Sequence, residues 1–420
     1  MYYLKIKTIQ LENFKGISRA AFGLDGKTTV FFGINGVGKS TVLRATNLLF
    51  SSMINKIVLQ RFKQGINIEL SDITFGKPSC SIDAEFLFSD GVVESYGRYM
   101  KRLGQKRTQD NKTLDEIRTK FRSQYIDDEN QNMPLFVNYG TNRLVVDIPL
   151  RIRTKHIFDK ESAFEKSIES KIDFRTFFEW FRYQEDVENQ FKARGNLQYT
   201  DKSLAAVKEA ITAMLDNVTN LRVERSPRLA MKVDKEGISL TIEQLSDGEK
   251  CTLALIGDLS RRLSLANPTL NNPNHGEGIV LIDEIELHMH PSWQRKILDR
   301  LIKTFPHIQF IITTHSPQVL GEIGEDINIF KLSREKNAFC CEKFSGMQGW
   351  DSNYILEDFM GTSALNQTTK GVIAHMFELI SKKDYQAASE YATKLEKMTD
   401  SAHEDVVKAR ILIARGKRGI

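Results

Sequence analysis

The 420-residue sequence has few cysteines and no long apolar segment. Its four cysteines, Cys80, Cys251, Cys340 and Cys341, match no metal-binding spacing, and neighbours such as Cys340 and Cys341 rarely form a disulfide. This predicts a reducing compartment, the cytoplasm. No run of about 18 apolar residues is present, which argues against a membrane-spanning helix. The alternating start MYYLKIKTIQLENF is unlike a secretory signal.

The charge of the chain is modest in sum but uneven. The formal net charge is +5, and the 41% hydrophobic and 27% charged residues are ordinary for a soluble protein of two or three core-sized units, or of one large domain with insertions. Residues 98–122 hold nine Lys or Arg against three acids, and LRIRTKH, Leu150–His156, is a second basic stretch. Such stretches are solvated faces or surfaces that contact DNA or RNA through phosphate charge.

The stretch FFGINGVGKST, Phe31–Thr41, ends a strand-like run and opens a helical one. Its spacing matches G-x-x-x-x-G-K-[ST], the phosphate-binding loop, in which glycines let many backbone N–H groups point at one anion. We expect Lys39 to reach the β- and γ-phosphates of ATP and the Ser40 hydroxyl to bind Mg²⁺. The predicted nucleotide-binding residues of this loop are Gly33, Asn35, Gly36, Gly38, Lys39, Ser40 and Thr41.

Two buried-strand patterns further along the chain end in residues that could complete a hydrolytic site. IVLIDE places Asp283 and Glu284 directly after four apolar residues, as in a Walker B strand. We predict that Asp283 assists Mg²⁺ and that Glu284 polarises the attacking water. About 30 residues later, IITTHSP ends a second apolar run with His315. We predict that His315 is a switch residue that reaches the γ-phosphate.

The stretch LSDGEK, Leu245–Lys250, resembles the LSGGQ signature of ABC-type ATPases, with Asp247 and Glu249 where Gly and Gln are usual. The resemblance implies that Ser246, the backbone of Gly248 and the helix N-terminus form an anion site. In ABC-type proteins the signature and the phosphate loop of one head cannot both reach one γ-phosphate. The heads therefore dimerise head to tail around ATP, which implies a homodimer or a higher oligomer here.

After the Walker B acids, DEIELHMHP, Asp283–Pro291, resembles the D-E-x-E-x-H-x-H-P element of RecF/OLD-like ABC ATPases of prokaryotes. The resemblance implies that Glu286–His288 occupy the D-loop, which touches the opposite head. IKTIQLENFKGI is similar to the first strand of that family, with Asn13–Lys15 where adenine or phosphate contacts are made. NYGTNR, Asn138–Arg143, ends a strand and could stand in for the Q-loop.

The resemblance covers about residues 3–335. It implies an α/β fold: an ABC-type P-loop ATPase head with an antiparallel β subdomain, a helical insertion and a small helical C-terminal region. The expected parts are residues 1–98 and 221–345 for the two halves of the head, 99–220 for a basic, helical insertion, and 346–420 for a helical, candidate partner-binding region. Within the insertion we expect one helix to pack an aromatic face against a neighbouring helix, through Phe174, Phe177, Phe178, Trp180 and Phe181.

No HNH, PD-(D/E)xK or TOPRIM nuclease pattern is present in the sequence. The helical C-terminus is similar to that of the PtuA-like ATPases of Septu anti-phage systems, which also occur beside retrons. That resemblance implies a separate HNH-type nuclease partner, no membrane partner, and a cytoplasmic ATPase that controls a nucleic-acid-directed effector. Two alternatives remain open: a RecF- or SMC-like DNA-repair ATPase, and a nucleotide-gated scaffold with little turnover. The presence of both Glu284 and His315 argues against the scaffold.

Overall fold

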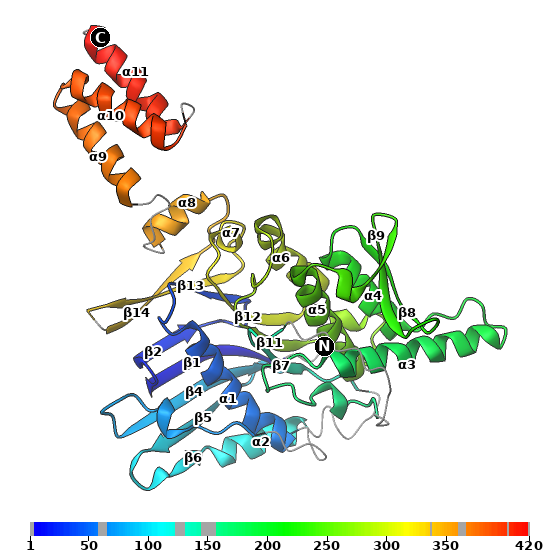
Figure 1. Cartoon of the computed structure of the whole chain (residues 1–420). Helices are drawn as coiled ribbons and strands as arrows, with labels where there is room; N and C mark the ends of the chain where they lie inside the picture. Colours follow the sequence, from blue (N-terminus) through cyan, green and yellow to red (C-terminus); the bar gives the residue numbers. More distant parts are fainter. Residues whose placement is uncertain are drawn as a thin grey trace. The chain divides into compact units, whose positions relative to one another are not determined.

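The computed structural model describes residues 4–57, 65–121, 131–143, 157–336, 338–359, 367–400 and 403–418 (Figure 1). The chain divides into two compact units, Met1–Trp350 and Asp351–Ile420. The first unit carries both large sheets, and the second is helical. Among the described residues, no helix is both long and apolar enough to cross a bilayer.

A six-stranded sheet forms the centre of the first unit, in the order β14-β13-β3-β12-β11-β7. All neighbouring strands are parallel except the β13–β14 pair. β3, β7, β11 and β12 are buried along their whole length, which is why they read as continuous apolar runs. The bounds are β3 Thr29–Phe32, β7 Leu135–Tyr139, β11 Gly278–Ile282, β12 Ile308–Thr314, β13 Asn328–Glu335 and β14 Ala338–Ser345.

A five-stranded antiparallel sheet, in the order β2-β1-β4-β5-β6, forms the predicted β subdomain. Burial alternates along β4, as expected for a strand with one face in the core. Helix α1, Lys39–Ile57, contacts strands of both sheets, and α2, Asn111–Phe121, contacts α1 and β5 (Figure 1). The strands are β1 Leu4–Phe14, β2 Ile17–Gly23, β4 Ser79–Phe88, β5 Val93–Lys101 and β6 Arg107–Gln109.

The remaining helices of this unit lie in the second half of its sequence, with a small antiparallel sheet β10-β9-β8. The five aromatic residues expected to form the packing face of α3, Phe174 to Phe181, are buried, and Phe177 packs closely on Gly257 of α5, which confirms the expected helix–helix contact. The bounds are α3 Phe174–Ala193, α4 Lys202–Met214, β8 Val218–Glu224, β9 Ala230–Lys235, β10 Ile238–Thr241, α5 Asp247–Ala266, α6 Pro291–Thr304 and α7 Pro317–Leu320.

The range 99–220, expected to be an insertion, also supplies part of the head. β7 pairs in parallel with β11 and forms the edge strand of the central sheet. This pairing joins segments about 140 residues apart, and no local pattern announces it.

The second unit has its own apolar core. Helices α9, α10 and α11 pack around Met376, Ala388, Leu395 and Ala409, with other small and apolar side chains. The bounds are α8 Ser352–Tyr354, α9 Gln367–Ser381, α10 Tyr385–Met398 and α11 Glu404–Arg418.

Candidate active site

The loop between β3 and α1 has the backbone that a phosphate-binding loop requires. Gly33, Gly36 and Gly38 have φ values of +149°, +78° and +122°, a region that L side chains avoid. A Cβ on Gly33 would also come 2.3 Å from the carbonyl oxygen of Leu332 on β13. Glycine is therefore required at residue 33 for two reasons, conformation and close packing.

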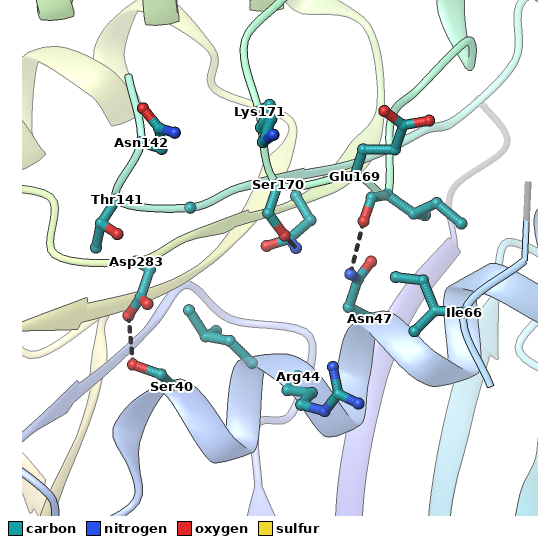
Figure 2. Close-up of a pocket in the computed structure, with 14 residues that line it drawn as sticks. Ser40, Arg44, Asn47, Ile66, Thr141, Asn142, Glu169, Ser170, Lys171 and Asp283 are labelled. Atoms are coloured by element: carbon teal, nitrogen blue, oxygen red, sulfur yellow. Dashed lines mark hydrogen bonds between the residues drawn. The ribbon is translucent and has the colours of Figure 1, made fainter. Parts of the chain in front are cut away.

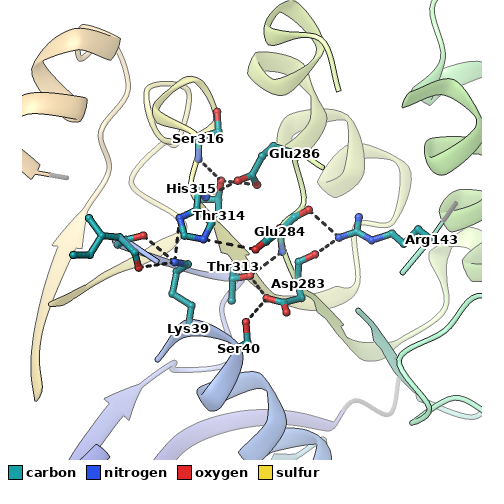
Figure 3. A network of polar contacts seen from close by, with 12 residues as sticks. Lys39, Ser40, Arg143, Asp283, Glu284, Glu286, Thr313, Thr314, His315 and Ser316 are labelled. Atoms are coloured by element: carbon teal, nitrogen blue, oxygen red, sulfur yellow. Dashed lines mark hydrogen bonds and ion pairs between the residues drawn. The ribbon is translucent and has the colours of Figure 1, made fainter. Parts of the chain in front are cut away.

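The Lys39 ammonium lies inside this loop. Its Nζ donates to the carbonyl oxygens of Gly33 at 2.8 Å and Ile34 at 3.0 Å, and lies 3.2 Å from Nδ1 of His315 (Figure 3). Burial lowers the pKa of Lys39 to about 8, although the nearby carboxylates act in the opposite direction. A phosphate beside this ammonium would favour its charged form and replace the carbonyl partners.

Asp283, at the end of β11, is hydrogen-bonded both to the phosphate-binding loop and to β12. One of its carboxylate oxygens accepts hydrogen bonds from Ser40 Oγ at 3.1 Å and from Thr313 Oγ1 at 2.5 Å (Figure 3). Magnesium prefers oxygen ligands and keeps several waters, and this hydroxyl–carboxylate pair fits it. In the described part of the chain no cluster of three or more His, Cys, Asp or Glu has a metal-binding arrangement. Ser40 and Asp283, together with nucleotide oxygens, would hold Mg²⁺ here.

Glu284 and His315 face each other at the ends of β11 and β12. Glu284 Oε1 lies 3.7 Å from His315 Nε2, and the Glu284 N–H donates to Thr313 Oγ1 at 2.8 Å. The φ of Glu284 is +49°, an uncommon conformation for a side-chain-bearing residue. Burial and the Lys39 charge lower the pKa of His315, against the attraction of the carboxylates. The lowered pKa favours the neutral imidazole, in which one ring nitrogen donates a hydrogen bond and the other accepts one.

Glu286 has a contact that the sequence did not predict. Its carboxylate accepts hydrogen bonds from Thr314 Oγ1 at 2.8 Å and from the His315 N–H at 2.5 Å (Figure 3). The resemblance to RecF/OLD-like proteins implied that this residue lies in a loop facing another head. Within its own head the side chain turns toward β12 and holds the main chain of His315, while the D-loop assignment stays a prediction.

The signature residue Ser246 is the N-cap of α5, where its Oγ accepts from the Glu249 N–H at 3.4 Å. Glu249 Oε2 in turn accepts from the Ser246 N–H at 2.9 Å and its hydroxyl at 2.8 Å, which completes a capping box. The other Glu249 oxygen lies 2.7 Å from Lys235 Nζ. Burial raises the pKa of Glu249, but the Lys235 charge and the Ser246 hydrogen bonds outweigh burial and hold it below its usual value. The unusual glutamate thus faces inward and stabilises the helix start.

Gly248 packs against the segment Glu286–His288, which is the predicted D-loop. A Cβ on Gly248 would come 2.5 Å from the carbonyl oxygen of His288, a residue with φ of +64°. His288 itself is exposed, as is Asp247, which forms a 3.2 Å ion pair with Lys250. Among the described residues no hydrogen bond joins residues 246–250 to the phosphate loop, 33–41.

A cleft of about 620 Å³ opens beside Ser40 and Asp283 (Figure 2). Its walls are α1, residues 168–171, and residues 138–142 at the end of β7. Asn138 Nδ2 donates to Ser170 Oγ. The segment expected to replace the Q-loop, Asn138–Arg143, therefore lies next to the candidate magnesium pair.

The resemblance implied adenine or phosphate contacts for Asn13–Lys15, but the Phe14 side chain does not reach the surface. Its side chain is 0% exposed and belongs to the core, so it cannot stack on a base. Lys15 Nζ lies 3.7 Å from Asp72, which is also held by Arg44 through two hydrogen bonds of 2.9 Å. The Lys15 charge is thus already partly neutralised within the head.

The basic cluster at residues 98–122 is only partly a free surface. Arg98 donates to the carbonyl oxygens of Leu48 and Ile66, and is 6% exposed. Arg102 donates to the oxygens of Lys77 and Ile73, and Arg107 to that of Ile68. These arginines fasten β5, the residue that follows it and β6 to the segment before β4, and Arg98 also joins β5 to α1. The second basic stretch, Leu150–His156, lies outside the described residues.

Comparisons with known proteins identify relatives of this chain. A family model described as "AAA domain, putative AbiEii toxin, Type IV TA system" matches residues 28–321. The chain is 32% identical over 417 residues to "Retron Ec83 probable ATPase" of Escherichia coli, covering 84% of this chain and 76% of that protein. It is 24% identical over 387 residues to "Septu protein PtuA" of Bacillus thuringiensis, covering 85% and 84%. It also resembles a solved "SMC head domain from Thermotoga maritima", with 15% identity, a TM-score of 0.45, and coverage of 81% and 99%.

The matched range, residues 28–321, includes Phe31–Thr41, Leu245–Lys250, Asp283, Glu284 and His315. The predicted α/β head with its antiparallel subdomain and helical C-terminal region is confirmed. The chain belongs to this AAA-domain family, as an ABC-type ATPase related to the retron and Septu PtuA ATPases.

Proposed function

We propose that this protein binds ATP with Mg²⁺ and hydrolyses it between two heads. The observation that carries the proposal is the convergence of Lys39, Ser40, Asp283, Glu284 and His315 at the carboxyl ends of three neighbouring parallel strands. The carboxyl edge of such a sheet is where α/β proteins bind ligands.

Each residue has one task in this proposal. The loop N–H groups and Lys39 bind the phosphates, while Ser40 and Asp283 hold Mg²⁺, which neutralises charge that develops on the phosphoryl oxygens. Glu284 orients the attacking water and accepts its proton. His315 donates a hydrogen bond toward the γ-phosphate, and its 3.7 Å separation from Glu284 keeps the two groups on the same reacting centre.

A second copy would supply the signature. Ser246 and Gly248 lie at a helix N-terminus, which favours an anion, and in the described structure they contact residue 288 and Glu249 rather than the phosphate loop. We therefore place them over the γ-phosphate of a partner head, in a head-to-tail homodimer. Glu249 turns inward, so the carboxylate that stays exposed at that helix N-terminus is Asp247, which pairs with Lys250.

The test of hydrolysis is Glu284→Gln, which keeps the shape of the side chain and removes the base. We expect ATP binding to persist and turnover to fall by about 10² to 10⁴-fold. Lys39→Ala is the matched comparison, because it should weaken nucleotide binding itself. Phosphate release and ATP binding by calorimetry are the two measurements. Equal turnover in wild type and Glu284→Gln would show that Glu284 does not orient the attacking water or accept its proton.

We also propose that ATP binding and hydrolysis by this protein control a separate effector nuclease of HNH type, in a retron- or Septu-like defence system against phage. The similarity to proteins named for retron and Septu systems supports this. The helical unit Asp351–Ile420, with its independent core, is the candidate docking region. Co-purification with the product of a neighbouring nuclease gene, with and without residues 351–420, tests this assignment. Unchanged capture by the shortened chain would contradict it.

A further inference from the structure

Arg143 contacts the main chain of both Walker B acids. Its Nη2 donates to the carbonyl oxygen of Asp283 and, at 2.8 Å, to that of Glu284 (Figure 3). Its Nε donates at 2.7 Å to the carbonyl oxygen of Gly140. One guanidinium thus joins the end of β7 to the turn that presents Glu284.

The burial of Arg143 makes this contact unusual. The residue is 2% exposed, and among the described residues no carboxylate lies within ion-pair distance of it. Burial lowers its pKa, while the nearby negative charges act in the opposite direction. A buried cation without a direct ion pair is expensive to maintain. Its hydrogen bonds all end on carbonyl oxygens, which indicates that it serves to fix backbone geometry.

The backbone that Arg143 holds is the part of the site that most needs support. Glu284 has a φ of +49°, which persists only when surrounding contacts determine it. Two other contacts help: the Asp283 N–H donates to the Tyr139 carbonyl at 2.9 Å, and the Glu284 N–H donates to Thr313. Arg143 donates to the carbonyl oxygens of both peptides, and the Glu284 carbonyl also accepts from the Leu287 N–H at 3.1 Å.

The same segment is bonded to the signature helix. The Tyr139 hydroxyl donates at 2.9 Å to Asp258 of α5, which is 0% exposed. Asp258 also accepts from Arg261 and Arg262 at 2.7 Å each. A rigid, buried contact therefore runs from α5, whose N-terminus carries the signature, through residues 139–143 to the Walker B turn.

We propose that Arg143 is a positioning residue for ATP hydrolysis. Arg143 holds the Asp283 and Glu284 peptides so that the Glu284 carboxylate is aligned with the attacking water. Because Arg143 belongs to residues 139–143, which are hydrogen-bonded to α5, this alignment depends on the position of the helix that carries the signature. This inference rests on the proposed hydrolytic function. It assigns no contact between Arg143 and the nucleotide.

The experiment compares Arg143→Lys and Arg143→Ala with wild type. We expect kcat to fall by about 10 to 10²-fold, since small misplacements of a catalytic group have effects of this size. The affinity for ATP should change little, because Lys39 and the loop are untouched. Millimolar guanidinium or methylguanidinium should restore part of the activity of Arg143→Ala and none of that of Glu284→Gln.

Arg98 provides the matched control. It is also a buried arginine that donates to main-chain carbonyls, but it lies on β5 and contacts Leu48 and Ile66. Arg98→Lys should alter thermal stability without a selective loss of kcat or rescue by guanidinium. If Arg143→Ala and Arg98→Lys lose activity only in proportion to stability, without rescue, the positioning role is wrong.

Amide hydrogen exchange of residues 283–289 separates this inference from the proposed function. Arg143→Ala should increase exchange there while exchange along β12 stays unchanged. Faster exchange in a protein whose wild type does not hydrolyse ATP would reject the proposed function but keep the backbone role. Normal wild-type hydrolysis with unchanged kcat in Arg143→Ala would reject the inference alone.

Discussion

A substitution at Ser246 tests whether the signature acts on the nucleotide of another head. Ser246→Arg removes the N-cap of α5 and places a long side chain at the proposed anion site. Loss of an N-cap costs about 1 kcal/mol, which is a small part of the stability of a well-packed unit. We therefore expect a folded protein that binds ATP as a single head and fails to dimerise or hydrolyse it.

Mixing Ser246→Arg with Lys39→Ala gives a recovery of turnover whose size can be calculated. A dimer of Ser246→Arg with Lys39→Ala has one composite site with both lesions and one with neither. Neither mutant homodimer is expected to assemble around ATP, so the dimers in an equimolar mixture are heterodimers, in which one of the two sites is intact. Two separately inactive proteins should then recover turnover, up to about half of the wild-type value per head.

The assay is phosphate release against mixing ratio, with light scattering to follow assembly. Asp201→Arg is the control, since Asp201 caps α4 in the same way, by accepting from the Leu204 N–H at 2.9 Å. It introduces the same side chain away from the signature and should leave turnover near wild type. Full activity of Ser246→Arg as a monomer, or no recovery in any mixture that forms dimers, would refute the two-head site.

The central residues were predictable because their signals are local. Strand, loop and helix lie within Phe31–Thr41, and an apolar run followed by acids shows where a buried strand ends. Parallel strands present their carboxyl ends at one edge, so the neighbours β3, β12 and β11 bring Lys39, His315 and Asp283 together. The motif order along the chain thus implied much of the geometry.

Arg143 and Glu286 were not predictable because their partners are defined by long-range pairing. Arg143 reaches residues 140 positions away only because β7 pairs with β11, inside a range that looked like an insertion. Glu286 reaches His315 because β11 and β12 are adjacent. Glu249 is different, because S-x-x-E before an apolar run is the local sequence pattern of a capping box.

Two further predictions follow from charged residues whose surroundings are now defined. The double substitution Lys101→Glu, Lys106→Glu should weaken binding of the purified protein to DNA or RNA and make that binding less dependent on salt. Both lysines are exposed, so the protein should stay folded. An unchanged salt dependence would show that this surface does not contact nucleic acid. Glu249→Gln should lower the free energy of unfolding at neutral pH by about 1 kcal/mol, since the amide keeps a hydrogen-bond acceptor but loses the ion pair with Lys235. The folded-state pKa of Glu249 is below its ordinary value, so its contribution is present above about pH 4.3 and is lost as pH falls through the folded-state pKa. Denaturant unfolding of both proteins across this range should show the two stabilities converging as the carboxyl group is protonated, and a constant difference would mean that the Glu249 charge has no part in the capping box.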